Sequence, residues 1–391
     1  MGIAMFPMWP HYGDDEIAAV TDVLASGRVN YWTGTLCREF EKEYAIHTGR
    51  QHAIALHNGT LALELALYAY GIGPGDEVIT TPRTFIASAS CVIMRGAKPV
   101  FADVDRESQN ITAATIERVI TDKTKAIIPV HLAGWPCAMD EIMALAERRK
   151  LIVIEDCAQA HGATYKGSPV GSFGHAAAFS FCQDKIITTG GEGGMLVLDD
   201  EDAWSRAWSY KDHGKNYDAV YNREHLPGFR WVHESFGTNW RMLEIQAAIG
   251  RLQLKKLSAW VSQRRANAAV LTERFRVITG LRLTIPPKQI SHAYYKYYTF
   301  IEPAALKSDW NRDRIMTKIM DAGVPCFSGS CSEIYLEAAF EGTRSRPPQR
   351  LSVACELGET SLMFVVHPTL RDADMYRMVD VVQSVMQGAV R

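Results

Sequence analysis

The sequence predicts an α/β fold, with a large domain built on a mostly parallel mixed sheet flanked by helices and a smaller C-terminal α/β domain. Between residues 52 and 198, short apolar runs alternate with helical stretches, which is typical of βαβ units. A long amphipathic helix follows residue 240, and helices and short strands alternate again beyond about residue 265. We therefore expect a large domain over 1–245 and a linking helix with a small domain over 246–391.

The first predicted helix covers residues 14–25. Three acidic residues at 14–16 suit the positive end of its dipole. Apolar residues recur on one face of this helix, at Ile17, Val20, Val23 and Leu24. Gly27 is expected to end the helix.

The alternating region then predicts the elements of the large domain in order. Its strands are expected at 52–56, 77–80, 99–102, 126–130, 151–155, 176–181 and 195–198. Its helices are expected at 60–70, 85–95 and 139–148, and a further helix is expected to end within 116–120. The long helix carries apolar residues at helical spacing, namely Ile245, Ile249, Leu252, Leu257 and Trp260. The small domain is expected to place elements around 294–301, 315–320 and 361–366.

Composition excludes several classes of protein. The net charge of −2 argues against a nucleic-acid-binding surface, and the absence of a run of eighteen apolar residues argues against a membrane span. The first ten residues lack the basic and apolar segments of a secretory signal, so we expect a cytoplasmic protein. The eight cysteines are scattered without a CxxC pair, which favours reduced thiols, and no metal-binding motif is present.

Chemically useful residues follow three of the predicted strands. In an open parallel sheet, ligands bind beyond the carboxyl ends of the strands. Asn58-Gly59-Thr60 starts a helix whose free N–H groups suit a phosphate, and Asp156 ends a largely apolar strand. Lys185 lies between an apolar strand and two isoleucines, where partial burial disfavours the ammonium form and frees the amine as a nucleophile.

Each of these signals also has an ordinary structural explanation. The helix start is commonly just a capped helix, Asp156 an N-cap, and Lys185 a lysine whose amine reaches solvent. Together, however, they supply a lysine for a Schiff base, an acid for a pyridine nitrogen and a binding site for a phosphate group. These are the parts needed to hold pyridoxal 5'-phosphate (PLP).

At this point the sequence resembles the DegT/DnrJ/StrS sugar aminotransferases, which are PLP enzymes of fold type I. The resemblance covers nearly the whole chain, and its motifs are specific as an ordered set. They include Asn58-Gly59-Thr60, EDCAQAHG at 155–162, GSFG at 171–174, Ser180 with Lys185, GEGG at 191–194 and GTNWRM at 237–242. The residues at 182–184, Cys-Gln-Asp, differ from the commonest family sequence at these positions.

The resemblance implies roles for residues around the cofactor ring. Lys185 matches the lysine that forms the Schiff base with PLP and later moves the proton. Asp156 matches the acid that pairs with the pyridine nitrogen, and Gln159 the residue near the ring hydroxyl. Phe85 matches the aromatic residue that stacks on the ring. His131 and His161 are interpreted as structural or supporting residues.

The resemblance also implies how the phosphate is held. Ser180 matches the phosphate-binding serine, with Gly59 and Thr60 supplying backbone and hydroxyl donors. Asn239 matches a phosphate ligand donated by the neighbouring subunit. That role implies a homodimer with shared active sites.

The implied activity is transfer of an amino group from glutamate, through a pyridoxamine phosphate form, to a nucleotide-linked keto-deoxysugar in amino-sugar and surface-polysaccharide biosynthesis. Some family members are dehydratases with histidine in place of the lysine, so Lys185 favours transamination. An aminotransferase for a free cyclitol ketone, a PLP-dependent sugar dehydratase and a regulator that kept the fold stay as alternatives. Retention of both Asp156 and Lys185 argues against the regulator.

Overall fold

The computed structural model describes residues 6–391 and contains a central seven-stranded sheet in the order β1-β9-β8-β5-β4-β2-β3. Its strands are β1 (His52–Leu56), β2 (Glu77–Thr80), β3 (Lys98–Phe101), β4 (Thr124–Ile128), β5 (Ile152–Asp156), β8 (Ala176–Ser180) and β9 (Gly194–Leu198). β9 is antiparallel to both of its neighbours, and the other pairs are parallel. Six strands therefore run in one direction, as the predicted mostly parallel sheet requires.

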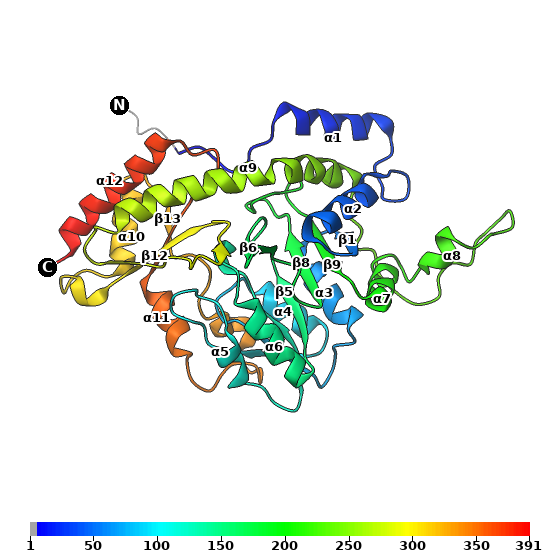
Figure 1. The fold of residues 1–391 in the computed structure, drawn as a ribbon, viewed down its shortest axis with the longest axis horizontal. Helices are drawn as coiled ribbons and strands as arrows, with labels where there is room; N and C mark the ends of the chain where they lie inside the picture. Colours follow the sequence, from blue (N-terminus) through cyan, green and yellow to red (C-terminus); the bar gives the residue numbers. More distant parts are fainter. Residues whose placement is uncertain (1–5) are drawn as a thin grey trace.

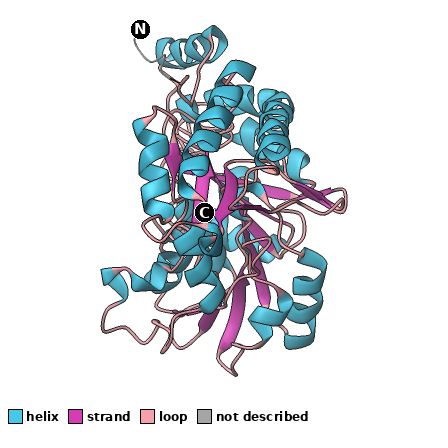
Figure 2. Ribbon diagram, turned by 90° about the vertical axis from the view of Figure 1, so that its left-hand side faces the viewer, coloured by secondary structure: helices cyan, strands magenta, loops and turns pink. Residues whose placement is uncertain are grey.

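Helices lie on both sides of this sheet, and Figure 2 shows the strands enclosed between them. The helices up to residue 221 are α1 (Asp14–Ser26), α2 (Leu36–Thr48), α3 (Gly59–Ala69), α4 (Ala87–Met94), α5 (Ala113–Glu117), α6 (Met139–Arg149), α7 (Glu201–Lys211) and α8 (Tyr217–Tyr221). The short 3₁₀ helices of the described chain are Leu132–Gly134, Pro303–Ala305, Ile334–Leu336 and Ala338–Phe340. None of the helices within residues 6–391 combines the length and apolar character needed to cross a bilayer.

The C-terminal part forms a second, antiparallel sheet in the order β10-β12-β14-β13. Its strands are β10 (Leu281–Leu283), β12 (Tyr297–Ile301), β13 (Cys326–Phe327) and β14 (Ser361–Phe364). The helices here are α10 (Arg312–Asp321), α11 (Ser352–Thr360) and α12 (Asp372–Ala389). A small third sheet joins β11 (Ile290–Ser291) to β6 (Thr164–Tyr165) and β7 (Ser168–Pro169), and so ties the C-terminal part to the large sheet.

The long helix α9 (Glu244–Phe275) connects these two regions, as Figure 1 shows. Its first half packs against α1 and α2, and its second half packs against α12 and β10. Ala268, Leu271 and Phe275 enter the apolar core of the C-terminal part. The boundary at 245/246 coincides with the start of α9, and the division into two domains stays a prediction.

The predicted strands of the large sheet all occur within two residues of their expected ends, but the helices differ. Helices α2, α7 and α8 have no counterpart in the prediction. On the apolar face of α1, Val23 is buried, whereas Ile17 and Leu24 are exposed. Polar contacts also link α1 to α9, since Lys256 lies 2.7 Å from both Asp15 and Glu16.

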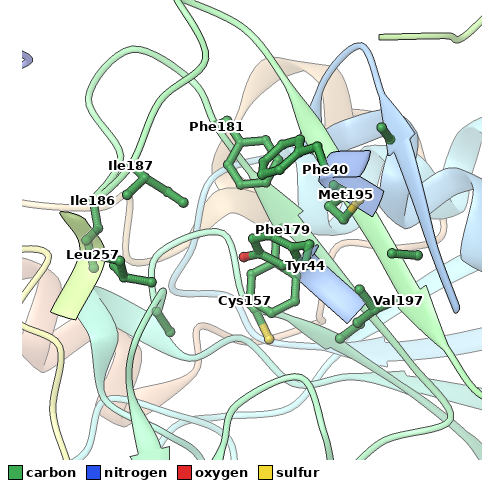
Figure 3. Close-up of a cluster of buried hydrophobic side chains, with 14 of the residues drawn as sticks. Phe40, Tyr44, Cys157, Phe179, Phe181, Ile186, Ile187, Met195, Val197 and Leu257 are labelled. Atoms are coloured by element: carbon green, nitrogen blue, oxygen red, sulfur yellow. The ribbon is translucent and has the colours of Figure 1, made fainter. Parts of the chain in front are cut away.

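A tightly packed core supports the loop that carries Lys185. Ile186 and Ile187 are fully buried in the same cluster as Phe181 and Leu257, as Figure 3 shows. The aromatic rings of Phe40, Tyr44 and Phe181 pack against one another with centroids 5.3 to 5.8 Å apart. Because these side chains anchor the residues directly after Lys185, the backbone of the lysine is fixed by the core. All eight cysteines are free thiols, as expected.

Candidate functional site

A cavity of about 690 Å³ opens where the carboxyl ends of β1, β5 and β8 meet. Parallel strands bring their carboxyl ends to one edge of a sheet, so the segments after these strands face a common space. Tyr298 and Met363 from the second sheet close the other side, together with Tyr295, which precedes β12. Of the predicted site residues, those lining the cavity are Gly59, Thr60, Phe85, Asp156, Gln159, Ser180 and Lys185.

The N-terminus of α3 offers free backbone donors to this cavity. Asn58 is its N-cap and accepts hydrogen bonds from the amides of Leu61 (3.0 Å, side chain) and Ala62 (3.3 Å, backbone). The amides of Gly59 and Thr60 have no acceptor within residues 6–391. Free amides at a helix N-terminus bind an anionic group, with the helix dipole adding to the attraction. The Ser180 hydroxyl lies at the same place.

Gly59 allows the helix to approach β8 closely. A Cβ atom at this position would lie 2.7 Å from Cβ and 3.1 Å from Cα of Ser180, which is closer than side-chain carbons pack. The absence of a side chain at Gly59 therefore brings the backbone donors of α3 next to the Ser180 hydroxyl. This arrangement fits the phosphate group of PLP.

Asp156 ends β5 and is buried. Its carboxylate accepts hydrogen bonds from the Ser88 hydroxyl (2.8 Å) and the Ala158 amide (3.1 Å). No cationic side chain of the described chain forms an ion pair with it. Burial raises the pKa of the Asp156 carboxyl, although the two hydrogen bonds act in the opposite direction. A buried acid without a cationic partner fits the protonated pyridine nitrogen of PLP.

Lys185 is partly buried, as expected, and its amine faces the second sheet. Its Nζ atom lies 3.3 Å from the Tyr295 hydroxyl and 3.4 Å from the Asp184 carboxylate. The indole N–H of Trp9 donates a 2.8 Å hydrogen bond to the backbone carbonyl of Lys185. The turn that follows contains Gly190 and Gly191 at φ +85° and +125°, a conformation that favours glycine.

Gln159 and Phe85 both line the cavity. The Gln159 side-chain oxygen accepts a 2.8 Å hydrogen bond from the Ala133 amide, so its NH₂ group is the part left to donate to a ligand. Phe85 is 69 % exposed although it is a large apolar residue. An exposed ring at the mouth of a cavity is available to stack on an aromatic ligand.

Asn239 is not brought to the cavity of its own chain. It is exposed, and its backbone pairs with Asp212 in an isolated bridge. Helix α9 starts at Glu244 with Leu243 as its N-cap residue, so Asn239 does not cap that helix. Its predicted contact with a phosphate is therefore possible only from a second copy of the chain.

The two histidines near the site are engaged in structural hydrogen bonds. His131 accepts from the Cys137 amide (3.0 Å) and contacts Glu155 (3.0 Å), while His161 bridges Tyr44 (2.9 Å) and the Ser180 carbonyl (2.8 Å). Burial lowers the pKa of His161 to about 3, so it is neutral. His131, Glu155 and Cys157 lie close together, but both nitrogens of His131 are already used. This cluster leaves no ring lone pair for a metal.

Two site residues that the sequence did not predict, Tyr295 and Lys296, lie in the segment directly before β12. Tyr295 donates a short hydrogen bond to Asp184, and Lys296 lies 3.7 Å from the same carboxylate. Burial would raise the pKa of Asp184, but the charges of Lys185 and Lys296 and the Tyr295 hydrogen bond hold it below its usual value. A predicted strand at 294–301 rich in tyrosine was the available signal, yet no spacing rule connects it to Lys185.

Comparisons with known proteins agree with this geometry. Residues 10–383 match the DegT/DnrJ/EryC1/StrS aminotransferase family. The chain is 35 % identical over 382 residues to the spore coat polysaccharide biosynthesis protein SpsC of Bacillus subtilis (97 % of this chain, 96 % of SpsC). It is 36 % identical over 361 residues to GDP-perosamine synthase of Caulobacter vibrioides (90 % and 91 %). The crystal structure of an aminotransferase from Psychrobacter cryohalolentis superposes with a TM-score of 0.96 at 55 % identity (98 % and 99 %).

Proposed function

Because the chain belongs to the DegT/DnrJ/EryC1/StrS aminotransferase family, we propose that it transfers an amino group from glutamate to a nucleotide-linked keto-deoxysugar with PLP as cofactor. The chain is a sugar aminotransferase of fold type I, with a role in amino-sugar biosynthesis. The proposal concerns the donor, the acceptor, the site residues and the dimer. The observation that carries it is the meeting of Lys185, Asp156 and the N-terminus of α3 in one cavity.

The roles of the residues follow from their positions. When bound, PLP supplies an electron sink for the carbon that carries the donor's amino group. Asp156 would pair with the pyridine nitrogen and keep it protonated. Lys185 would hold the cofactor through its amine and, once released, carry a proton from the donor's Cα on Nζ. The amides of Gly59 and Thr60 and the Ser180 hydroxyl would hold the phosphate.

Two further residues would orient the ring. Gln159 has its side-chain oxygen fixed by Ala133, so its NH₂ group can donate to the ring hydroxyl. Phe85 would stack on the ring and exclude water from one face. Asp184 and Tyr295 contact the Lys185 amine, and so set the direction from which it approaches the donor.

The acceptor is proposed to be a nucleotide-linked keto sugar because a relative at 36 % identity is named GDP-perosamine synthase. The test is to incubate the PLP-loaded protein with glutamate and keto sugars linked to UDP, GDP or dTDP, and to measure 2-oxoglutarate and the amino sugar by mass spectrometry. Lys185→Ala is the control. Amination of only a free cyclitol ketone, or loss of water from the sugar without amination, would replace the proposal by one of its alternatives.

A homodimer is proposed because the chain carries a projecting apolar arm. Residues 217–236, with α8, extend from the body of the molecule (Figure 1). Four large apolar side chains of this arm are 76 to 97 % exposed, namely Leu226, Phe229, Trp231 and Phe236. Exposed apolar surface of this kind is typical of an interaction site. A second copy would cover it, and Asn239 directly follows the arm.

Mixed dimers test whether the sites are shared. Lys185→Ala chains and Asn239→Asp chains are each expected to be inactive, since aspartate repels the phosphate. A heterodimer has one site with both defects and one with neither, so random pairing should restore roughly a quarter of wild-type activity. Refolding each variant alone under the same conditions is the control. Mixtures that stay as inactive as the parents would show that Asn239 does not act across an interface.

A further inference from the structure

A second cavity of about 610 Å³ adjoins the first one. Asp184, Tyr295, Lys296 and Phe327 line both cavities, so the two spaces share a wall close to Lys185. The remaining walls come from the N-terminal segment 6–9, the segment from Met320 to Phe327, and Arg264 of α9. The roles proposed above make no use of this cavity.

Arg264 is a buried cation without an acidic partner. The residue is 1 % exposed, and its Nη1 donates a 3.3 Å hydrogen bond to the Tyr295 carbonyl. Its Nε and Nη2 atoms have no hydrogen-bond partner within the described chain. Burial lowers its pKa to about 9, so the guanidinium still carries its charge at neutral pH. Buried charged donors left unpaired are costly, which indicates that a ligand completes them.

Lys296 adds a second cation to the same cavity. Its Nζ lies 3.7 Å from Asp184 and 4.7 Å from the centroid of the Tyr295 ring. The Asp184 carboxylate is shared with Lys185 and accepts the Tyr295 hydroxyl, so it does not neutralise Lys296 alone. His367 also lines the cavity, and burial lowers its pKa to about 3, so it adds no charge. Lys296 therefore shares its carboxylate with Lys185, and Arg264 forms no ion pair within the described residues.

We propose that Arg264 and Lys296 form a subsite for a carboxylate group of the amino donor. The inference rests on the proposed function, in which the donor is glutamate. Asp184, Tyr295 and Lys296 line both cavities. A donor whose carboxylate is bound in the second cavity would therefore extend past these residues and direct its amine toward Lys185. The planar guanidinium can bind a carboxylate through two parallel hydrogen bonds, and the lysine supplies a point charge. Both residues bind and position the donor, and neither takes part in proton transfer.

The test uses Arg264→Met and Lys296→Met in the PLP-loaded enzyme, with Lys288→Met on an exposed lysine as the control. The first measurement is the affinity for glutarate, an unreactive dicarboxylate, by titration calorimetry. The second is a single turnover with glutamate alone, followed by the change in the visible band of the cofactor. Each variant should weaken glutarate binding and raise the half-saturating glutamate concentration about tenfold or more. The rate at saturating glutamate should change little.

The outcomes separate this inference from the proposed function. If glutamate fails to convert the wild-type cofactor, the proposed function fails. If wild type converts but both variants keep glutarate and glutamate affinities within twofold, the carboxylate subsite is refuted. Weakened binding of UDP or GDP with unchanged glutarate binding would also refute it and assign the cations to a phosphate. If Arg264→Met does not fold, as judged by its thermal unfolding, Lys296→Met decides the question.

Discussion

Asp156→Asn separates the role of a buried charge from that of a buried hydrogen-bonding group. Asparagine has nearly the same shape. Its side-chain oxygen can still accept from the Ala158 amide, and its NH₂ group then faces the Ser88 oxygen, which can accept a hydrogen bond; these two partners lie 3.1 and 2.8 Å from different oxygens of the native carboxylate. The fold should therefore survive. The substitution removes the negative charge that would face the pyridine nitrogen of PLP.

The expected loss in activity follows from the strength of a charge-assisted hydrogen bond. Such a bond contributes about 1.5–3 kcal/mol, which corresponds to roughly a ten- to hundredfold decrease in the rate of the glutamate half-reaction. The rate is measured by stopped-flow absorbance at saturating glutamate. Asp122→Asn, at an exposed position, is the matched control.

Stability gives an independent measurement. Burial raises the pKa of Asp156 in the apoprotein, so the folded state binds the carboxyl proton more tightly than the unfolded chain does. As the pH rises and this carboxyl ionises, the folded state therefore loses stability. Apo Asp156→Asn should therefore melt at or above the wild-type temperature at neutral pH. Saturation with PLP should raise the melting temperature of wild type more than that of the variant. A variant whose half-reaction stays within threefold of wild type, with an equal PLP shift, would refute the pairing of Asp156 with the cofactor.

Three other substitutions or conditions give further predictions. Borohydride should fix PLP on Lys185, shown by peptide mass spectrometry, and Lys185→Ala should bind PLP only reversibly; labelling of another lysine would contradict the assignment. Gly59→Ala should weaken PLP binding by about 1–3 kcal/mol, because the added Cβ would lie 2.7 Å from Cβ of Ser180, whereas Gly73→Ala, with only one contact at 3.7 Å, should not. Burial lowers the pKa of His161 and His292 to about 3, so stability should fall as pH drops below their unfolded pKa near 6.5, by about 1.4 kcal/mol per histidine at pH 5.5. Denaturant unfolding at pH 7 and 5.5 measures this loss, and equal stability at both would contradict the burial argument.

The large sheet and its edge residues were predictable because both depend on local pattern. Short apolar runs predict strands, and the rule that ligands bind at their carboxyl ends then singles out Asp156 and Lys185. The exposure of Ile17 and Leu24 in α1 was not predictable in this way. Its apolar residues have the spacing of a buried face, but the pattern does not tell whether the partner surface belongs to the same chain. Asn239 is exposed as well, and its contact with a phosphate of a second copy stays a proposal.

The second sheet explains the rest of the difference, because it reaches the site from 110 residues away in the sequence through Tyr295. No periodicity predicts which side chain crosses that distance. The departure from the commonest family pattern at 182–184 nevertheless becomes understandable in the structure. Asp184 is the carboxylate that lies between Lys185 and Lys296 and accepts the Tyr295 hydroxyl.

With a neutral residue in place of Asp184, no carboxylate would lie between the amines of Lys185 and Lys296. Like charges in a partly buried space repel strongly. Asp184 and Lys296 therefore act as a pair. The Asp184 carboxylate attracts the Lys185 amine and also offsets the charge of Lys296. Lys296 is then available to bind an anionic ligand. The unusual local sequence beside Lys185 thus matches the two residues, Tyr295 and Lys296, that the segment before β12 brings to the site.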